Sequence, residues 1–176
     1  IISNMLLFSR KSESEIAELD LHELLNNTIE LARNDYDLKK SFDFKQIELI
    51  REYDQKIKTL WCTETELEQV ILNLLRNAAQ ALSLKEGSEQ PCIVVRTISE
   101  EKSATIEIDD NGPGMDEEIR QRVFEPFYTT RPPGQGTGLG LSVSYYIIHD
   151  RHQGGMRIES QPGKGAKLII SLPISG

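Results

Sequence analysis

Long apolar runs, clusters of basic residues and a cysteine-rich framework are all missing from this 176-residue sequence. No apolar run approaches the ~20 residues needed to cross a bilayer, so we expect a soluble chain, although a longer parent could be membrane-anchored. The formal charge of -8 disfavours broad contact with nucleic acid, whose phosphates are bound by clustered Lys and Arg. Two cysteines, Cys62 and Cys92, lack metal-site spacing, and we expect two reduced thiols in the cytosol.

The length allows one domain with its own core and disfavours a second full domain. Residues 1–10 have the apolar spacing of the last turns of a helix, and a polar run over 11–15 follows. We therefore expect a helical remnant with a linker over 1–19 and one globular domain over 20–176. The apolar start lacks the basic leader and the cleavage site of a secretory signal.

Helices and strands do not alternate regularly along the chain, which indicates an α+β fold. The expected architecture is a two-layer sandwich with helices packed on one face of a mixed sheet. Periodicity and turn residues predict helices that begin near residues 20, 63, 116 and 139. Strands are predicted over 47–53, 57–62, 93–98, 104–109, 156–160 and 166–172.

Two of the expected helices combine a cap with an apolar stripe. Asp20 is the expected N-cap of the first, and Thr63 with Glu66 is an expected capping box at the start of the second. The first stripe comprises Leu21, Leu24, Leu25, Thr28, Leu31 and Ala32. The second comprises Leu67, Val70, Ile71, Leu74, Leu75, Ala78 and Leu82.

Asn73 and Asn77 lie four residues apart on the second of these helices, at the border of its apolar stripe. A ligand cleft could open at that border, and an amide oxygen suits Mg²⁺, which takes phosphate oxygens as further ligands. Taken alone, the pair is better explained by two asparagines that hydrogen-bond to neighbouring backbone.

The segment 110–114, Asp-Asn-Gly-Pro-Gly, follows an expected strand. Asp110 could accept a hydrogen bond from an exocyclic amine such as adenine N6, which a purely apolar pocket could not select. Gly112 and Gly114 would let the backbone approach a flat ring closely. The alternative is a solvated turn between a strand and a helix, which Asp-Asn-Gly sequences commonly form.

Glycines at 134, 136, 138 and 140 alternate with other residues, and the last two lead into an expected helix. Unpaired amides and the dipole at a helix start can hold an anion, so phosphates could bind here despite the acidic chain. The pattern is neither a P-loop nor a dinucleotide-binding motif. A flexible linker is the alternative, but it does not explain why an apolar helix begins within the glycines. The Pro/Gly-rich stretch 126–138 is expected to be a mobile lid.

Other residues near the expected lid have less specific interpretations. The run 124–128, Phe-Glu-Pro-Phe-Tyr, is an expected hydrophobic plug at the base of the lid. Arg131 is the best-placed cation for a terminal phosphate, with a solvated surface arginine as the alternative. Three histidines are expected to be non-catalytic, namely His22, His149 and His152.

Four segments, in this order, resemble the N, G1, F and G2 boxes of sensor histidine kinases. They are 73–78 (NLLRNA), 110–114 (DNGPG), 124–127 (FEPF) and 134–141 (GQGTGLGL). The resemblance runs from about residue 20 to the end of the chain. Residues 6–10 resemble the end of a dimerisation helix of this family, and the phosphoacceptor histidine motif is absent.

The resemblance implies a Bergerat-type ATP-binding fold and transfer of the ATP γ-phosphoryl group to a histidine on a dimerisation hairpin. It implies that Asn77 coordinates Mg²⁺, that Asn73 contacts the phosphate and metal region, and that Asp110 recognises adenine. The implied ATP-binding set is completed by Gly112, Gly114, Phe127, Arg131, Gly136, Thr137, Gly138, Leu139 and Gly140.

The same resemblance implies two partners, the protein's own dimerisation and phosphoacceptor domain and the receiver domain of a response regulator. The parent is expected to be a cytoplasmic homodimer, and neither nucleic acid nor direct membrane contact is expected. A conformational ATPase is disfavoured because Asn73 stands where hydrolytic relatives have a glutamate that activates water. A nucleotide-sensing module and a serine kinase remain alternatives. The stretch 150–155 departs from the usual family sequence.

Overall fold

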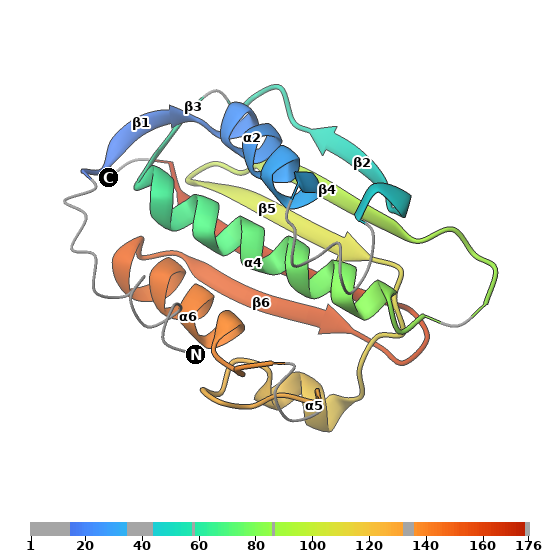
Figure 1. Cartoon of the computed structure of the whole chain (residues 1–176). Helices are drawn as coiled ribbons and strands as arrows, with labels where there is room; N and C mark the ends of the chain where they lie inside the picture. Colours follow the sequence, from blue (N-terminus) through green and yellow to red (C-terminus); the bar gives the residue numbers. More distant parts are fainter. Residues whose placement is uncertain (1–14, 35–43, 58, 86, 132–135, 175–176) are drawn as a thin grey trace.

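The computed structural model describes residues 15–34, 44–57, 59–85, 87–131 and 136–174 (Figure 1). The expected helical remnant over 1–10 lies outside these residues, as does Gly134 of the expected lid. Within the described residues, no helix combines the length and the apolar character that crossing a membrane requires.

Five strands form the main sheet, in the order β2-β4-β5-β7-β6. β2 pairs in parallel with β4, whereas the other neighbouring strands are antiparallel, so the sheet is mixed as expected. Each strand lies within one residue of its expected bounds. The strands are β2 Glu48–Tyr53, β4 Cys92–Ser99, β5 Ser103–Asp110, β6 Gly155–Ser160 and β7 Ala166–Pro173.

The helices lie on one face of this sheet, which confirms the expected two-layer α+β sandwich (Figure 1). α2 (Leu21–Asn34) and α4 (Glu64–Leu82) cover the sheet, and α6 (Gly140–Tyr146) lies beside α4. α6 continues directly into a π-helical turn, η2 (Ile147–Arg151). The remaining helical elements are the short α5 (Glu117–Arg122) and the 3₁₀ turn η1 (Phe44–Gln46).

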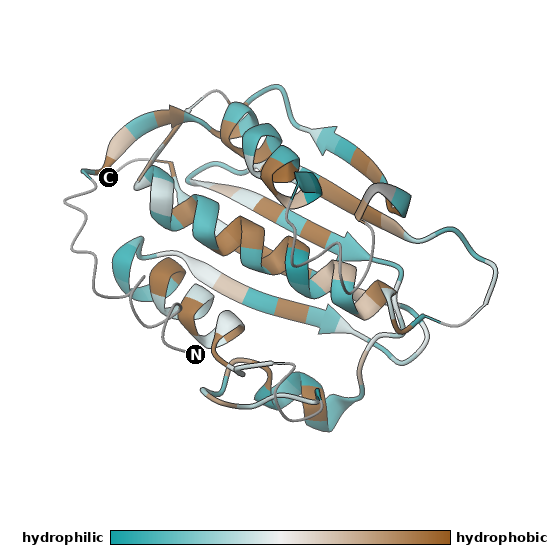
Figure 2. Ribbon diagram, viewed as in Figure 1, coloured by the Kyte–Doolittle hydropathy of each residue, from teal (hydrophilic) through white to brown (hydrophobic). Residues whose placement is uncertain are grey.

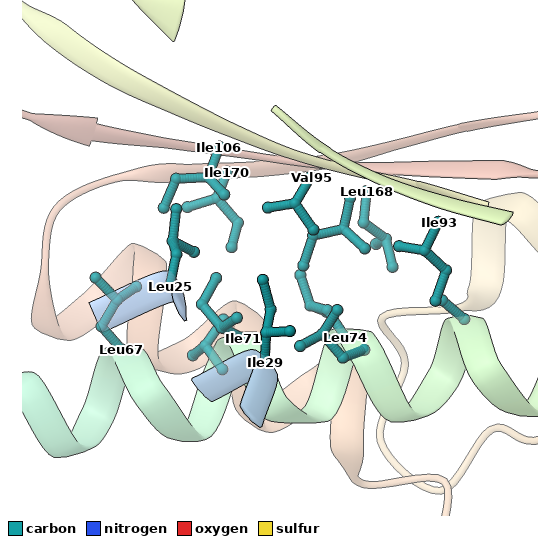
Figure 3. Close-up of a cluster of buried hydrophobic side chains, with 14 of the residues drawn as sticks. Leu25, Ile29, Leu67, Ile71, Leu74, Ile93, Val95, Ile106, Leu168 and Ile170 are labelled. Carbon is teal, nitrogen blue, oxygen red and sulfur yellow. The ribbon is translucent and has the colours of Figure 1, made fainter. Parts of the chain in front are cut away.

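Hydrophobic residues recur along α4 at helical spacing, and they point at the sheet (Figures 2 and 3). All members of the expected stripe of α4 are buried, as are most of those of α2. The prediction for Leu31 is wrong, because its side chain is 50% exposed while Ile29 is fully buried in its place. A four-residue step from Leu25 leads to Ile29, which faces the same side of the helix.

The two expected N-caps differ in outcome. Asp20 caps α2, because its Oδ1 accepts hydrogen bonds from the backbone N–H groups of His22 (2.9 Å) and Glu23 (3.0 Å). The capping box at Thr63 is wrong, since the Thr63 side chain makes no capping hydrogen bond. The backbone N–H of Thr63 instead donates to Nε2 of His152 (3.1 Å), a residue far away in the sequence.

A small second sheet was not expected from the sequence. β1 (Ala17–Asp20) pairs antiparallel with β3 (Thr59–Cys62), which matches the second half of the expected strand over 57–62. β1 leads directly into α2, so this sheet fixes the start of that helix. Cys62 of β3 is buried, and both cysteines are free, as expected.

Candidate functional site

Asn73 and Asn77 both contact segments that lie far away in the sequence. The Oδ1 of Asn77 accepts a hydrogen bond from the Arg131 guanidinium (3.0 Å). A Cβ placed on Gly140 would lie only 2.6 Å from the Oδ1 of Asn73, so the start of α6 packs directly on this amide. One side of α4 therefore contacts the expected lid at Arg131 and the start of the helix that follows the lid.

The loop that follows β5 reaches the same helix one turn further on. A Cβ on Gly112 would lie 3.5 Å from the Cβ of Ala81 and 2.7 Å from the Oδ1 of Asp110. Ala81 follows Asn77 by four residues and so lies on the same side of α4. The structure thus brings the 110–114 segment, the paired asparagines and the lid together along α4, although they lie far apart in the sequence.

Asp110 is a buried carboxylate at the end of β5, only 6% exposed. Its Oδ1 accepts a hydrogen bond from the backbone N–H of Gly112 (2.9 Å). Burial raises the pKa of Asp110 to about 6, although hydrogen bonds from the backbone N–H groups of Gly112 and Ala166 lower it. A carboxyl kept in such surroundings is a candidate for ligand recognition, because desolvation disfavours its charged form.

Two glycines near Asp110 lie so close to neighbouring atoms that a side chain would not fit at either position. Any side chain on Gly112 would press on the Asp110 carboxylate. Gly114 has a φ of +67°, and a Cβ there would collide with the backbone oxygen of Gln161 in the turn after β6. Both positions therefore require glycine, one for the carboxylate and one for the close approach of two loops.

Arg131 is held at Asn77 by its surroundings as well as by the hydrogen bond. Burial lowers the pKa of its guanidinium from the ordinary value. The backbone N–H of Arg131 donates a hydrogen bond to the hydroxyl of Thr129 (3.2 Å). Gly136 also lies close by, since a Cβ there would be 3.1 Å from the Arg131 Cδ. The expected phosphate-binding cation is thus a half-buried arginine that already faces the amide expected to hold a metal ion.

The two ends of the expected lid meet at one backbone hydrogen bond, from the N–H of Phe127 to the carbonyl of Gly138 (2.9 Å). Both residues have positive φ, 65° for each, and a side chain on Gly138 would collide with the Phe127 backbone. Just beyond this contact, the hydroxyl of Thr137 accepts from the N–H of Leu139 (3.3 Å) at the start of α6. These contacts define the entry to the lid and its exit.

The expected hydrophobic plug is correct for one phenylalanine and wrong for the other. Phe124 packs against the core and against the ring of Tyr145 of α6, at 5.4 Å between ring centroids. Phe127 is 75% exposed, because its left-handed backbone turns the chain towards Gly138. A positive φ is uncommon for a bulky residue, so Phe127 is held in a strained conformation at the lid base.

The three histidines have structural surroundings. His152 is buried, with Nε2 accepting from Thr63 and Nδ1 against the carbonyl of Ile147 (3.1 Å), which fixes it as the Nδ1–H tautomer. The ring of His22 stacks on Tyr53 at 4.7 Å between centroids. His149 lies on η2, and its ring stacks on that of Tyr145 at 5.4 Å between centroids.

Ser144 was missed by the sequence reasoning. Its hydroxyl, 2% exposed, accepts a hydrogen bond from the Nδ2 of Asn73 (2.9 Å) and so helps to hold that amide against α6. The available signal is its spacing, because Ser144 follows Gly140 by four residues and both face α4. A polar residue on the buried side of a helix needs a partner, and here that partner is Asn73.

An open cleft of about 620 Å³ lies elsewhere, beside the turn between β6 and β7. Two of its basic side chains are already engaged: Arg120 pairs with Glu117 (2.7 Å), and Lys167 lies 3.7 Å from Asp109. None of the expected ATP-binding residues lines it. The expected ATP-binding residues lie along α4 and away from this cleft.

Comparisons with known proteins agree with this arrangement. The signature of the family described as "Histidine kinase-, DNA gyrase B-, and HSP90-like ATPase" matches residues 62–176. The signal transduction histidine-protein kinase AtoS of Escherichia coli is 35% identical over 99% of this chain. The match covers 27% of AtoS, so the chain spans about a quarter of the length of this curated relative.

Solved structures share the fold. The nucleotide-free catalytic domain of histidine kinase ThkA superposes with a TM-score of 0.74 at 29% identity, covering 91% of this chain and 96% of that domain. A longer ThkA chain, solved in complex with the response regulator TrrA, has a TM-score of 0.75 at 25% identity. That match covers 99% of this chain and 46% of the ThkA chain.

Proposed function

Because the chain belongs to the histidine kinase, DNA gyrase B and HSP90-like ATPase family, we propose that it is the ATP-binding catalytic domain of a two-component sensor histidine kinase. In this function the γ-phosphoryl group of ATP passes to a histidine nitrogen on a dimerisation hairpin, ADP leaves, and the phosphoryl group is later relayed to an aspartate of a response regulator. The likeness to AtoS and to the ThkA catalytic domain supports this assignment over the other branches of the family.

The observation that carries the proposal is the buried carboxylate of Asp110 beside Gly112. A carboxylate with a raised pKa gains stabilisation from a hydrogen-bond donor that enters its pocket, and the 6-amino group of adenine is such a donor. Gly112 keeps a side chain away from the carboxylate, and Gly114 allows the loop to pack against Gln161. Asp110 thus selects adenine, and the two glycines shape the base pocket.

The phosphate side of the site would use the asparagines and the lid. Asn77 would hold Mg²⁺ through Oδ1, the atom that accepts the Arg131 hydrogen bond in the protein alone, and Asn73 would contact the same region. Arg131 is then released to pair with a terminal phosphate oxygen. Mg²⁺, when bound, neutralises charge on the phosphates during transfer. The lid residues that would line the phosphates are Phe127, Gly136, Thr137, Gly138, Leu139 and Gly140.

Phosphoryl transfer is favoured over hydrolysis by the chemistry of Asn73. An amide cannot take a proton from water at neutral pH, and the Nδ2 of Asn73 is engaged by Ser144. The acid or base that assists the transfer would then belong to the dimerisation hairpin. We expect the chain alone to bind ATP and to become phosphorylated poorly or not at all.

The wider context belongs to the same proposal. Residues 20–176 would be the catalytic domain and 1–19 the end of a dimerisation helix with its linker. The partners would be the protein's own phosphoacceptor domain and a receiver domain, and the ThkA–TrrA complex supports this choice for a relative. The parent would be a homodimer in the cytoplasm.

Binding is tested by titration calorimetry of the chain with ATP at saturating Mg²⁺. We expect heat of binding from the unchanged chain and an affinity at least about tenfold lower for Asp110→Asn, since a hydrogen bond to a charged group is lost. Asp109→Asn is the matched control, because this neighbouring carboxylate lies on the other face of the sheet near Lys167. No heat from ATP, or equal affinity for Asp110→Asn, would contradict the proposed site.

Transfer is tested by mixing the chain with a separately made dimerisation hairpin and radiolabelled ATP. We expect the label on the hairpin and little on the chain itself. Labelling of the chain alone to a comparable extent would contradict the assignment. Mg²⁺-dependent release of phosphate above background, without labelling of the hairpin, would favour a conformational ATPase instead.

A further inference from the structure

The turn between β6 and β7 packs on the loop that carries the expected adenine site. Gly165 in this turn has a φ of +77°, and a Cβ on it would collide with the carbonyl oxygen of Asp110. The backbone N–H of Gly163 donates to the carbonyl of Pro113 (2.7 Å), and Gly114 lies against the carbonyl of Gln161. Backbone therefore meets backbone along the whole of the loop.

Ser160, the last residue of β6, joins the two segments through its side chain. Its hydroxyl donates to the carbonyl of Gly165 (2.7 Å) and accepts from the backbone N–H of Met115 (3.0 Å). One hydroxyl can do both, because it has one donor and two acceptor lone pairs. Ser160 thereby fixes the far end of the 110–115 loop to the base of the turn.

The same turn also supplies a direct contact to the Asp110 carboxylate. Ala166 follows Gly165 and is paired with Asp110 across β7 and β5, and its backbone N–H lies near enough to the carboxylate to lower its pKa. A shift of Gly165 would move this N–H, and a shift of Met115 would move the other end of the loop. The hydroxyl of Ser160 restrains both.

We propose that Ser160 is a positioning residue for base recognition, which holds Asp110 and its loop in the geometry that reads the 6-amino group of a purine nucleotide. This inference rests on the proposed function, because it assigns a role within the same site. Ser160 does not touch the base itself. It acts through the turn at Gly165 and through the loop end at Met115.

The test compares ATP with purine riboside triphosphate, which lacks the 6-amino group. We expect Ser160→Ala to weaken ATP binding about fivefold and to leave binding of purine riboside triphosphate nearly unchanged, because only ATP uses the oriented carboxylate. Ser160→Thr retains the hydroxyl and should restore most of the ATP affinity. Ser103→Ala is the matched control, since this hydroxyl bonds to Glu100 (2.6 Å) at the other end of the sheet and should change neither affinity.

The alternative is that the hydroxyl only strengthens the fold. In that case Ser160→Ala would weaken both nucleotides by the same factor, or neither, and either result would overturn the inference. If Ser160→Ala does not fold, Ser160→Cys, with a weaker donor, should give a smaller loss that is again confined to ATP. A failure of the proposed base recognition looks different, because the unchanged chain would then bind both nucleotides equally or not at all.

Discussion

Replacing Asp110 by asparagine should stabilise the nucleotide-free protein at neutral pH while it removes base recognition. Burial raises the pKa of Asp110 from 3.8 to about 6, and each pKa unit corresponds to about 1.4 kcal/mol. The folded state therefore binds the proton more tightly than the unfolded state does. This stabilising contribution is complete below about pH 3.8 and is lost as the pH rises through about 6.

At pH 8 the ionised carboxylate therefore leaves the fold about 3 kcal/mol less stable than its protonated form would be. Asparagine is neutral and has nearly the same shape. Its Oδ1 can still accept the hydrogen bond from Gly112, but its NH₂ group would face the N–H of Ala166, and this loss reduces the gain. We expect Asp110→Asn to raise the free energy of unfolding at pH 8 by about 1 to 3 kcal/mol.

Urea unfolding at pH 8 and at pH 5, without nucleotide, measures this difference. The gain should shrink at pH 5, where the native carboxyl is already largely protonated. For a chain of this length the melting temperature should rise by about 2–4 °C for each kcal/mol. Asp54→Asn is a control of opposite sign, because hydrogen bonds from the backbone N–H groups of Lys56 and Ser99 lower the pKa of Asp54. A gain that is equal at both pH values, or a loss at pH 8, would refute the reasoning.

Three further predictions concern the site and its support. The affinity for Mg²⁺-ATP should fall as the pH drops through about 6, because Asp110 is then protonated and accepts the adenine hydrogen bond less well. Calorimetry at pH 5 and pH 8 measures this change, and Asp110→Asn should abolish the pH dependence of the affinity. Arg131→Met should reduce the preference for ATP over ADP about tenfold, because the terminal phosphate loses its cation. The ratio of the two dissociation constants measures this preference, and an unchanged ratio would show that Arg131 does not bind the phosphate. His152→Ala should lower the free energy of unfolding by about 2 kcal/mol, since the N–H of Thr63 loses its acceptor. The ATP affinity should stay constant, because His152 contacts the N-terminal end of α4, far from Asn77. Weaker ATP binding would show that His152 supports the site.

The layered fold could be predicted because its longest elements are strongly periodic. Leu67, Ile71 and Leu74 recur at helical spacing along α4. β4 contains an apolar run, and β5 alternates between apolar and polar residues, as strands commonly do. β1 was missed although its four residues alternate between apolar and polar, because so short a run becomes a strand only through its pairing with β3. The burial of Ile29 in place of Leu31 likewise depends on how α2 is rotated against α4.

The candidate site was likewise only partly predictable from the sequence. The residue types at 73, 77 and 110–114 could be recognised because each motif is local in the sequence. The contacts that orient them could not, because they join distant segments: Arg131 reaches Asn77, Ser144 reaches Asn73, and Ser160 reaches Met115. Thr63 shows the same limit, since a local capping pattern gave way to a histidine brought in by the tertiary fold.

The backbone hydrogen bond from Phe127 to Gly138 joins the two ends of the segment 128–137, and Arg131 ties this segment to Asn77 of α4. A loop whose ends are already joined can gain or lose residues at a small cost in chain entropy, because the entropy of loop closure changes only with the logarithm of loop length. Insertions between Arg131 and Gly136 should therefore leave the sheet undisturbed, whereas a change that displaces Arg131 would break its hydrogen bond to Asn77 of α4. The stretch between Arg131 and Gly136 is therefore the part of this loop that an engineer could redesign with the least effect on the fold.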